Sequence, residues 1–236
     1  MPNRTCSKWG GIVLALAAAA FFTRAARSGP EPTRLRDLYG LPRPSSLHPP
    51  HTALVLVDFQ NEFVAGGLRL PAARAAITHA AELARWARQA GILVILVENV
   101  IDRPNAPLFA AGAKNTELVP QLTPQPGDLV LRKSMAGAFS HTDFDQQLRT
   151  RGIDTLIVGG LMTHLAVLVT VIDASVLGYK VLVAADSTAT RPLPGLPGEP
   201  PIDAPALQRA ALATLSDRFA DVLLSGEIMR LPLTNP

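Results

Sequence analysis

Short, uninterrupted apolar runs alternate along this chain with longer segments of helical periodicity, and this alternation constrains the fold more than any other feature. The apolar runs, which we interpret as strands, are Ala53–Val57, Ile92–Val97, Asp128–Leu131, Thr155–Val158, Lys180–Ala184 and Asp221–Leu224. The predicted helices are Ala72–Gln89, Thr142–Arg151, Thr163–Leu177 and Ala204–Phe219. Strands without polar alternation are buried on both faces, so the pattern predicts an α/β fold with one parallel sheet between two helical layers.

The composition divides the chain into three parts. Residues 1–28 are basic and apolar, residues 29–51 are rich in proline without a sustained period, and residues 52–236 carry the alternating pattern. A chain of 236 residues, 48% of them hydrophobic, can build one sizeable core in the third part. We interpret residues 29–51 as a linker, or as a strap that lies on the domain.

The first part has the layout of a secretory signal peptide. Arg4 and Lys8 precede the apolar run Trp9–Phe22, and small and basic residues follow at Thr23–Arg27. The apolar run is shorter than the roughly 20 residues that a membrane span needs. We therefore predict export to the periplasm or the medium. An uncleaved membrane anchor and a misassigned start codon are the alternatives.

The basic balance of the whole chain comes from this first part. It holds four basic residues and no acidic ones, so removing these four charges from the net +3 leaves −1. The remainder has no basic stripe with interleaved aromatic residues, which argues against a nucleic-acid partner. The only cysteine, Cys6, also lies here, so a processed chain would have no disulfide, no thiolate ligand and no cysteine nucleophile.

A strand-to-helix turn within Gly159–Tyr179 is the first candidate for a functional site. Thr163 is the expected N-cap of the helix that ends at Gly178. The first turn of a helix presents free backbone N–H groups and the positive end of its dipole to the preceding crevice. Acyl-transfer enzymes place a nucleophile in such a turn, whereas this chain has Ala166 there.

Two charged residues directly follow other predicted strands. Asp58 follows the first strand in LVLVDFQNEF, and Lys133 follows the third in LVLRKSMAGAF. Ligands of open α/β sheets bind at the carboxyl ends of the strands, where an aspartate can act as general acid or base. Taken singly, Asp58 could cap loop amides and Lys133 could be a solvated surface residue. At neighbouring strand ends they can form an ion pair, which favours a functional role for both.

Taken together, these motifs resemble the isochorismatase-like cysteine hydrolase superfamily. The resemblance covers roughly Thr52–Leu224 and rests, in order, on VDFQNEF, LRKSMAGAF, GGLMTHLAVLVTVIDASVLGYKVLVAADSTATR and ALQRAALATLSDRFADVL. It implies a three-layer Rossmann-like fold with six parallel strands in the order 3-2-1-4-5-6. It also implies a homo-oligomer, a dimer or larger, that acts on a small-molecule substrate.

The resemblance assigns roles to individual residues. The family's catalytic Asp and Lys correspond to Asp58 and Lys133, and its nucleophilic Cys corresponds to Ala166. The family's cis peptide bond would fall between Leu161 and Met162. The amides of Met162 and Ala166 would then be directed at a carbonyl or carboxylate oxygen of the substrate.

The alanine decides the predicted chemistry. A methyl group cannot form an acyl-enzyme, and the hydroxyls nearby in the sequence do not hold its position: Ser134, Ser140 and Thr163. Isochorismatases proper also have a small residue there and hydrolyse a vinyl ether non-covalently, the Asp protonating the substrate before water attacks the cation. They carry a His two residues earlier, where this chain has His164. However, Met162 replaces their aromatic residue, and His164 could equally face a neighbouring subunit.

Other features bear on the pocket and on cofactors. Phe63 is expected to form a wall of the site or to pack in the core. The segment after the second strand, ENVIDRPNAPLFAAGAK, lacks the histidines of the family's metal-dependent nicotinamidases, so no metal is predicted. No glycine-rich fingerprint follows the first strand, so the layout does not imply NAD, and no other cofactor is predicted.

The leading hypothesis is an exported, cofactor-free hydrolase that acts on a vinyl ether or C–N bond through Asp58 and Lys133. The alternative is a catalytically degenerate relative that binds a small ligand or serves as an oligomeric scaffold, which Ala166 also favours. A third explanation is deliberate replacement of Cys by Ala to trap a complex. The signal segment, which engineered proteins usually lack, argues against it.

Overall fold

The computed structural model describes residues 31–103 and 105–234, and the predicted signal segment lies outside these ranges. The strands are β1 (Thr52–Val57), β2 (Leu93–Asn99), β3 (Leu129–Lys133), β4 (Thr155–Leu161), β5 (Lys180–Ala189) and β6 (Asp221–Leu223). The α-helices are α1 (Leu35–Leu38), α2 (Ala73–Gln89), α3 (Phe144–Thr150), α4 (Leu168–Val176), α5 (Ala204–Thr214) and α6 (Ser225–Ile228).

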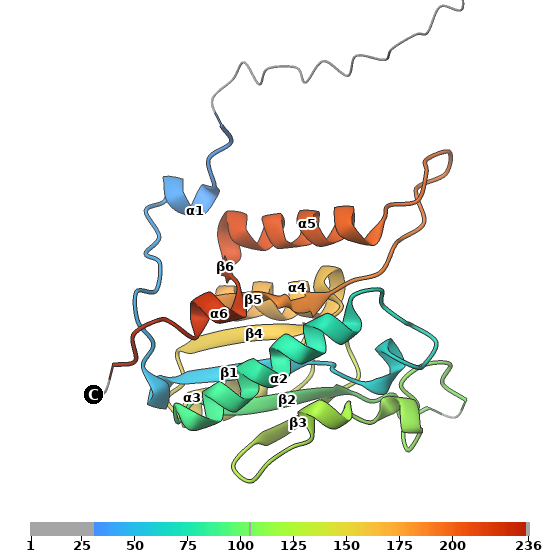
Figure 1. Ribbon diagram of the computed structural model, residues 1–236, viewed down its shortest axis with the longest axis horizontal. Coiled ribbons are helices and arrows are strands. Elements are labelled where there is room, and N and C mark those ends of the chain that lie inside the picture. The colour runs from blue at the N-terminus through green and yellow to red at the C-terminus, as the bar shows by residue number, and fades with distance from the viewer. Residues whose placement is uncertain (1–30, 104, 235–236) are drawn as a thin grey trace, which may run out of the picture. The chain divides into compact units, whose positions relative to one another are not determined.

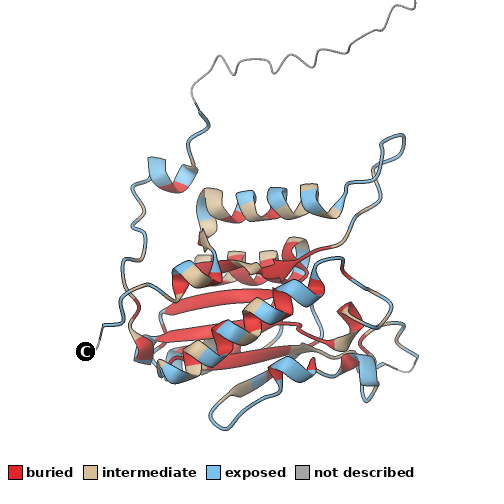
Figure 2. Cartoon of the chain, viewed as in Figure 1, coloured by how far each residue is buried: buried red, intermediate tan, exposed pale blue. Residues whose placement is uncertain are grey.

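The strands form one parallel sheet in the order β3-β2-β1-β4-β5-β6 (Figure 1), which confirms the predicted fold class and strand order. Every residue of β1 and β4 is buried, as their sequences without polar alternation predict (Figure 2). The outer surface of α2 is exposed, so this helix covers one face of the sheet and presents its polar side to solvent.

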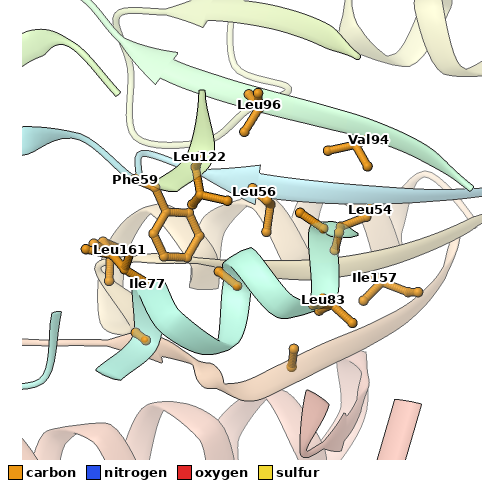
Figure 3. Close-up of a cluster of buried hydrophobic side chains, with 14 of the residues drawn as sticks. Leu54, Leu56, Phe59, Ile77, Leu83, Val94, Leu96, Leu122, Ile157 and Leu161 are labelled. Atoms are coloured by element: carbon orange, nitrogen blue, oxygen red, sulfur yellow. The ribbon is translucent and has the colours of Figure 1, made fainter. Parts of the chain in front are cut away.

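Apolar side chains fill both sides of the sheet. Between α2 and the sheet, Leu54 and Ile157 from the strands meet Leu83 from the helix (Figure 3). On the other side, alternate strand residues such as Val55 pack with α3 and α4. Because successive strand residues point to opposite faces, β1 contributes to both clusters and ties the two helical layers together.

Strands β4 and β5 run past their predicted ends, to Leu161 and Ala189. The sequence predicts a short turn that begins at Gly160. In the structure Gly160 stays in β4, where an added Cβ would lie only 2.6 Å from the Val57 carbonyl oxygen. The glycine therefore permits the close approach of β4 to β1.

Two predicted helices are each part α-helix and part π-helix. The segment predicted as Thr163–Leu177 begins with a π-helical turn, Thr163–Val167, before α4. The Met162 carbonyl accepts a hydrogen bond from the N–H of Val167, five residues along, at 3.3 Å. A second π-helical turn, Leu215–Phe219, follows α5 in the same way. The periodicity of a sequence does not distinguish such turns from α-helix.

The residues that precede β1 lie against the domain. Arg36 in α1 forms a buried ion pair with Asp221, with Nη2 and Oδ2 2.8 Å apart. The Leu47 side chain is buried in the core, and its N–H donates to the Pro232 carbonyl at 2.8 Å. Across residues 31–103 and 105–234, the helices are all too short or too polar to span a bilayer.

Candidate functional site

Asp58 and Lys133 meet at the carboxyl edge of the sheet. Asp58 directly follows β1 in a left-handed conformation, with φ at 56°, and its N–H donates to the Val97 carbonyl at 2.9 Å. Lys133 ends β3, and its Nζ donates to Asp58 Oδ2 at 2.7 Å and to the Met135 carbonyl at 3.0 Å. Both side chains are almost fully buried, so the predicted ion pair is confirmed and a solvated Lys133 is wrong.

Burial controls the charge of the Asp58 carboxyl. Loss of solvation raises its pKa to about 6, while the charge of Lys133 and its hydrogen bond act in the opposite direction. The second carboxyl oxygen, Oδ1, is buried and has no hydrogen-bond partner among the described residues. A carboxyl with this pKa and one free oxygen can exchange a proton with a substrate near neutral pH.

The peptide bond between Leu161 and Met162 is cis, as the family resemblance implied. The Met162 carbonyl accepts from the N–H groups of Leu165, at 3.1 Å, and Val167, but not from that of Ala166 between them. Ala166 itself is buried and packs in the apolar cluster on the α4 side of the sheet. This turn thus brings a methyl group, not a nucleophile, close to the sheet edge.

The prediction that Thr163 is an N-cap is wrong. Met162 precedes the first turn, and Thr163 lies inside it with its side chain fully buried. Its hydroxyl donates to Gln208 Oε1 at 2.7 Å, and Gln208 Nε2 in turn donates to the Thr188 hydroxyl at 2.8 Å. A threonine at a helix start can cap or can bond to another element, and here the bond to α5 replaces the cap.

His164 contacts the end of β5. Its Nδ1 forms a hydrogen bond with the Thr190 hydroxyl just after the strand. Burial, and then the nearby charge of Arg191, lower the pKa of His164 below its usual value. The lowered pKa favours the neutral imidazole, and the bond to Thr190 fixes the orientation of the ring.

Arg191 is a functional candidate that the sequence analysis did not single out. It follows β5 as Asp58 follows β1, and its Nη1 donates to the Pro192 carbonyl at 3.1 Å. Its Nε is buried and has no partner in the described part of the chain. It was missed because the predicted fifth strand ends at Ala184, whereas β5 runs to Ala189 and brings Arg191 to the edge where ligands bind.

Asn99 and Gln60 were also missed. Asn99 ends β2 directly opposite Lys133 in the parallel register, and its Oδ1 is buried without a partner among the described residues. Gln60 is fully buried and bonds to both backbone groups of Asn99, each at 2.9 Å. Gln60 therefore fixes the loop after Asp58 to the end of β2. The sequence signal was a polar residue inside VDFQNEF.

Phe63 lies in the core cluster on the α2 side. Its side chain is buried, and its ring centroid is 5.5 Å from that of Phe109. A cavity of about 330 Å³ lies nearby, lined among others by Phe109, Asn99 and Arg103. This places the segment after β2 beside the sheet edge.

Among the described residues, His, Cys, Asp and Glu form no cluster that could hold a metal ion.

Comparisons with known proteins agree with this architecture. The isochorismatase domain model matches residues 52–227. The secreted isochorismatase effector Isc1 of Verticillium dahliae is 31% identical over 194 residues, which span 82% of this chain and 97% of that protein. The ureidoacrylate amidohydrolase RutB of Azorhizobium caulinodans is 33% identical over 62% of this chain and 80% of its own length.

A solved structure has the same fold. The isochorismatase from Pseudomonas putida KT2440 superimposes with a TM-score of 0.74 at 29% identity, covering 84% of this chain and 99% of that one. The family match spans most of the chain and begins at the first residue of β1. The chain therefore belongs to the isochorismatase family of hydrolases, whose members include amidohydrolases.

Proposed function

We propose that this chain hydrolyses a small molecule without a covalent intermediate, with Asp58 as proton donor and acceptor and Lys133 as its charged partner. The observation that carries the proposal is the buried Asp58 carboxyl with its pKa of about 6 and its free Oδ1. Ala166 supports a non-covalent route, because by resemblance it stands where the family's nucleophilic cysteine would be.

The substrate class that best fits is an enol ether, as in isochorismate. Asp58 would give its proton to the terminal carbon of the double bond, whose electron pair forms the new C–H bond and leaves an oxygen-stabilised cation. Water adds to the cationic carbon and returns a proton to Asp58. The hemiketal then collapses to a ketone and an alcohol, its hydroxyl proton passing to the leaving oxygen. These reaction steps need an acid, a base and water, and Asp58 acts first as the acid and then as the base.

Two further groups suit this substrate class. The free Nε of Arg191 can bind a substrate carboxylate, since a guanidinium forms strong charge-assisted hydrogen bonds with such groups. The backbone amides of Met162 and Ala166 would bind a second carbonyl or carboxylate oxygen. Neutral His164 holds Thr190 and so fixes the chain from which Arg191 extends.

Hydrolysis of a C–N bond is the second candidate. It is favoured by the similarity to RutB, which is named as a ureidoacrylate amidohydrolase. Without a thiol at position 166, Asp58 would have to act as a general base on water, in its ionised form. A catalytically degenerate relative that only binds a ligand remains the alternative to both.

The test is hydrolysis of isochorismate and of a panel of small amides and ureido acids. The proteins compared are the wild type, Asp58→Asn, Arg191→Gln and Ala166→Cys, with Glu82→Gln, a solvent-exposed change on α2, as the control. We expect turnover of the enol ether that is lost on Asp58→Asn and unaffected by Glu82→Gln. Turnover of amides only by Ala166→Cys would instead identify an amidase that has lost its nucleophile.

The proposed setting is outside the cell. The predicted signal segment supports export, and the relative Isc1 is named as a secreted effector. The family resemblance supports a homo-oligomer, with a small molecule as the substrate.

A further inference from the structure

A second cavity lies at the opposite edge of the sheet from Asp58. Its walls include Thr155 and Lys180, the first residues of β4 and β5, together with residues 41–46 of the strap and Thr234. Its volume is about 860 Å³, within the range of small-molecule sites. The carboxyl-edge residues Asp58, Lys133 and Ala166 take no part in it.

The charged side chains of this cavity have a positive excess. Two of the lining residues are acidic, Asp154 and Asp221, whereas four are basic: Arg36, Arg43, Lys180 and Arg218. Asp221 pairs with Arg36, at 2.8 Å, and Asp154 pairs with Lys180, at 3.6 Å. Arg43 pairs with a carboxylate outside the lining, and Arg218 lies over the Tyr39 ring at 5.5 Å. The remaining positive charge favours an anionic ligand.

Buried polar groups in the wall lack hydrogen-bond partners. Arg36 is 6% exposed, and its Nε and Nη1 have no hydrogen-bond partner in the described chain, although Nη2 is bonded to Asp221. The Nδ1 of His48, another lining residue, is buried and also unpartnered there. Buried polar groups are nearly always satisfied in native structures, so each of these groups calls for a partner. A carboxylate, phosphate or sulfate brings only acceptors, as Arg36 requires.

Flat rings form another part of the wall. The half-buried ring of Phe219 lines the cavity beside Tyr179, whose own ring is buried and covered by the Arg149 guanidinium at 4.5 Å. His48 and His51 stack with their centroids 4.7 Å apart. We propose that this cavity is a second ligand site, which binds a small organic anion with a flat apolar body.

The test measures binding to the full chain by calorimetry, with naphthalene-1-acetate as probe. Its neutral counterpart is 2-(1-naphthyl)ethanol, which has the same ring system without the charge. We expect one molecule of the anion to bind per chain and the alcohol to bind at least ten-fold more weakly. The double variant Lys180→Gln/Arg218→Gln should weaken the anion at least ten-fold, and Arg85→Gln, an exposed arginine on α2, should leave it unchanged.

A second variant separates this cavity from the catalytic edge. Ser175→Trp fills the cavity without changing its charge and should abolish binding, whereas Asp58→Asn should not alter it. The proposal is overturned if neither probe binds, or if the alcohol binds as tightly as the anion. It is also overturned if Asp58→Asn removes the binding, which places the probe at the catalytic edge. Conversion of an oligomer to monomers by Ser175→Trp would overturn it too, because a second copy then fills the cavity.

Discussion

Asp58 combines a strand end, a left-handed backbone and a buried carboxyl, and its protonation should be visible in the pH dependence of activity. If it acts as the acid, kcat/KM on an enol ether falls as the pH rises through about 6, because the proton-carrying form is lost. If it acts as a base on a C–N bond, kcat/KM rises through the same pH. A profile that is flat between pH 5 and 8 would contradict both roles.

Lys133 should stabilise the fold chiefly when Asp58 is ionised. In Lys133→Met the pKa of Asp58 in the folded state rises further above its unfolded value of 3.8, since the offsetting charge is gone. The folded state then binds more protons than the unfolded state, so stability is retained at low pH and lost as the pH rises through the folded pKa. Urea unfolding should show a larger loss at pH 8 than at pH 5, and Asp58→Asn/Lys133→Met should abolish that difference.

At the scale of elements, the close approach of β4 to β1 depends on Gly160. In Gly160→Ala the new Cβ would lie 2.6 Å from a backbone oxygen, which cannot move as a side-chain end can. We expect a loss of about 1–3 kcal/mol of unfolding free energy, as for other overpacked cores. Gly226→Ala in α6 meets nothing closer than 3.7 Å and is the matched control, which should be neutral or slightly stabilising. Equal losses in both variants would contradict the packing argument.

The buried side-chain amide of Gln60 helps to hold the loop after β1. Gln60→Met should leave both backbone groups of Asn99 without their side-chain partner and loosen the chain that carries Asp58. Unpaired buried groups cost about 1–3 kcal/mol, so denaturant unfolding should detect the change. A fall in kcat with KM preserved would indicate that Gln60 positions the acid; unchanged kcat would show a structural role alone.

How much of the molecule the sequence predicts varies with the range of the contacts. Strand positions, strand order and the Asp58–Lys133 pair follow from local patterns and from family motifs. The π-helical turns, the partner of Thr163 and the closeness that Gly160 allows depend on residues far away in the chain. Gln60 stands inside a motif that the sequence shows, but its bonds to Asn99, the place of Arg191 and the cavity at Arg36 became visible only in the folded chain.

For the whole molecule, the N-terminal pattern makes a direct prediction. Expressed with its own N-terminus in a host that recognises the signal, the chain should appear in the exported fraction. Mass spectrometry of the exported protein should show a chain that lacks about the first 28 residues, the length of the basic and apolar segment. A full-length chain found in the membrane fraction would instead identify an uncleaved anchor.

The contact between Leu47 and the C-terminal residues has a practical consequence. Leu47 accepts from the Thr234 N–H at 2.9 Å while donating to Pro232, so the segment before β1 and the C-terminal residues meet at one place. That place is at the start of β1, at the end of the sheet remote from Asp58. A fusion or surface tether joined after Thr234 would therefore leave the carboxyl edge of the sheet, with Asp58, facing outwards. Immobilised on a support by its C-terminal end, the protein should keep the access to substrate that it has in free solution.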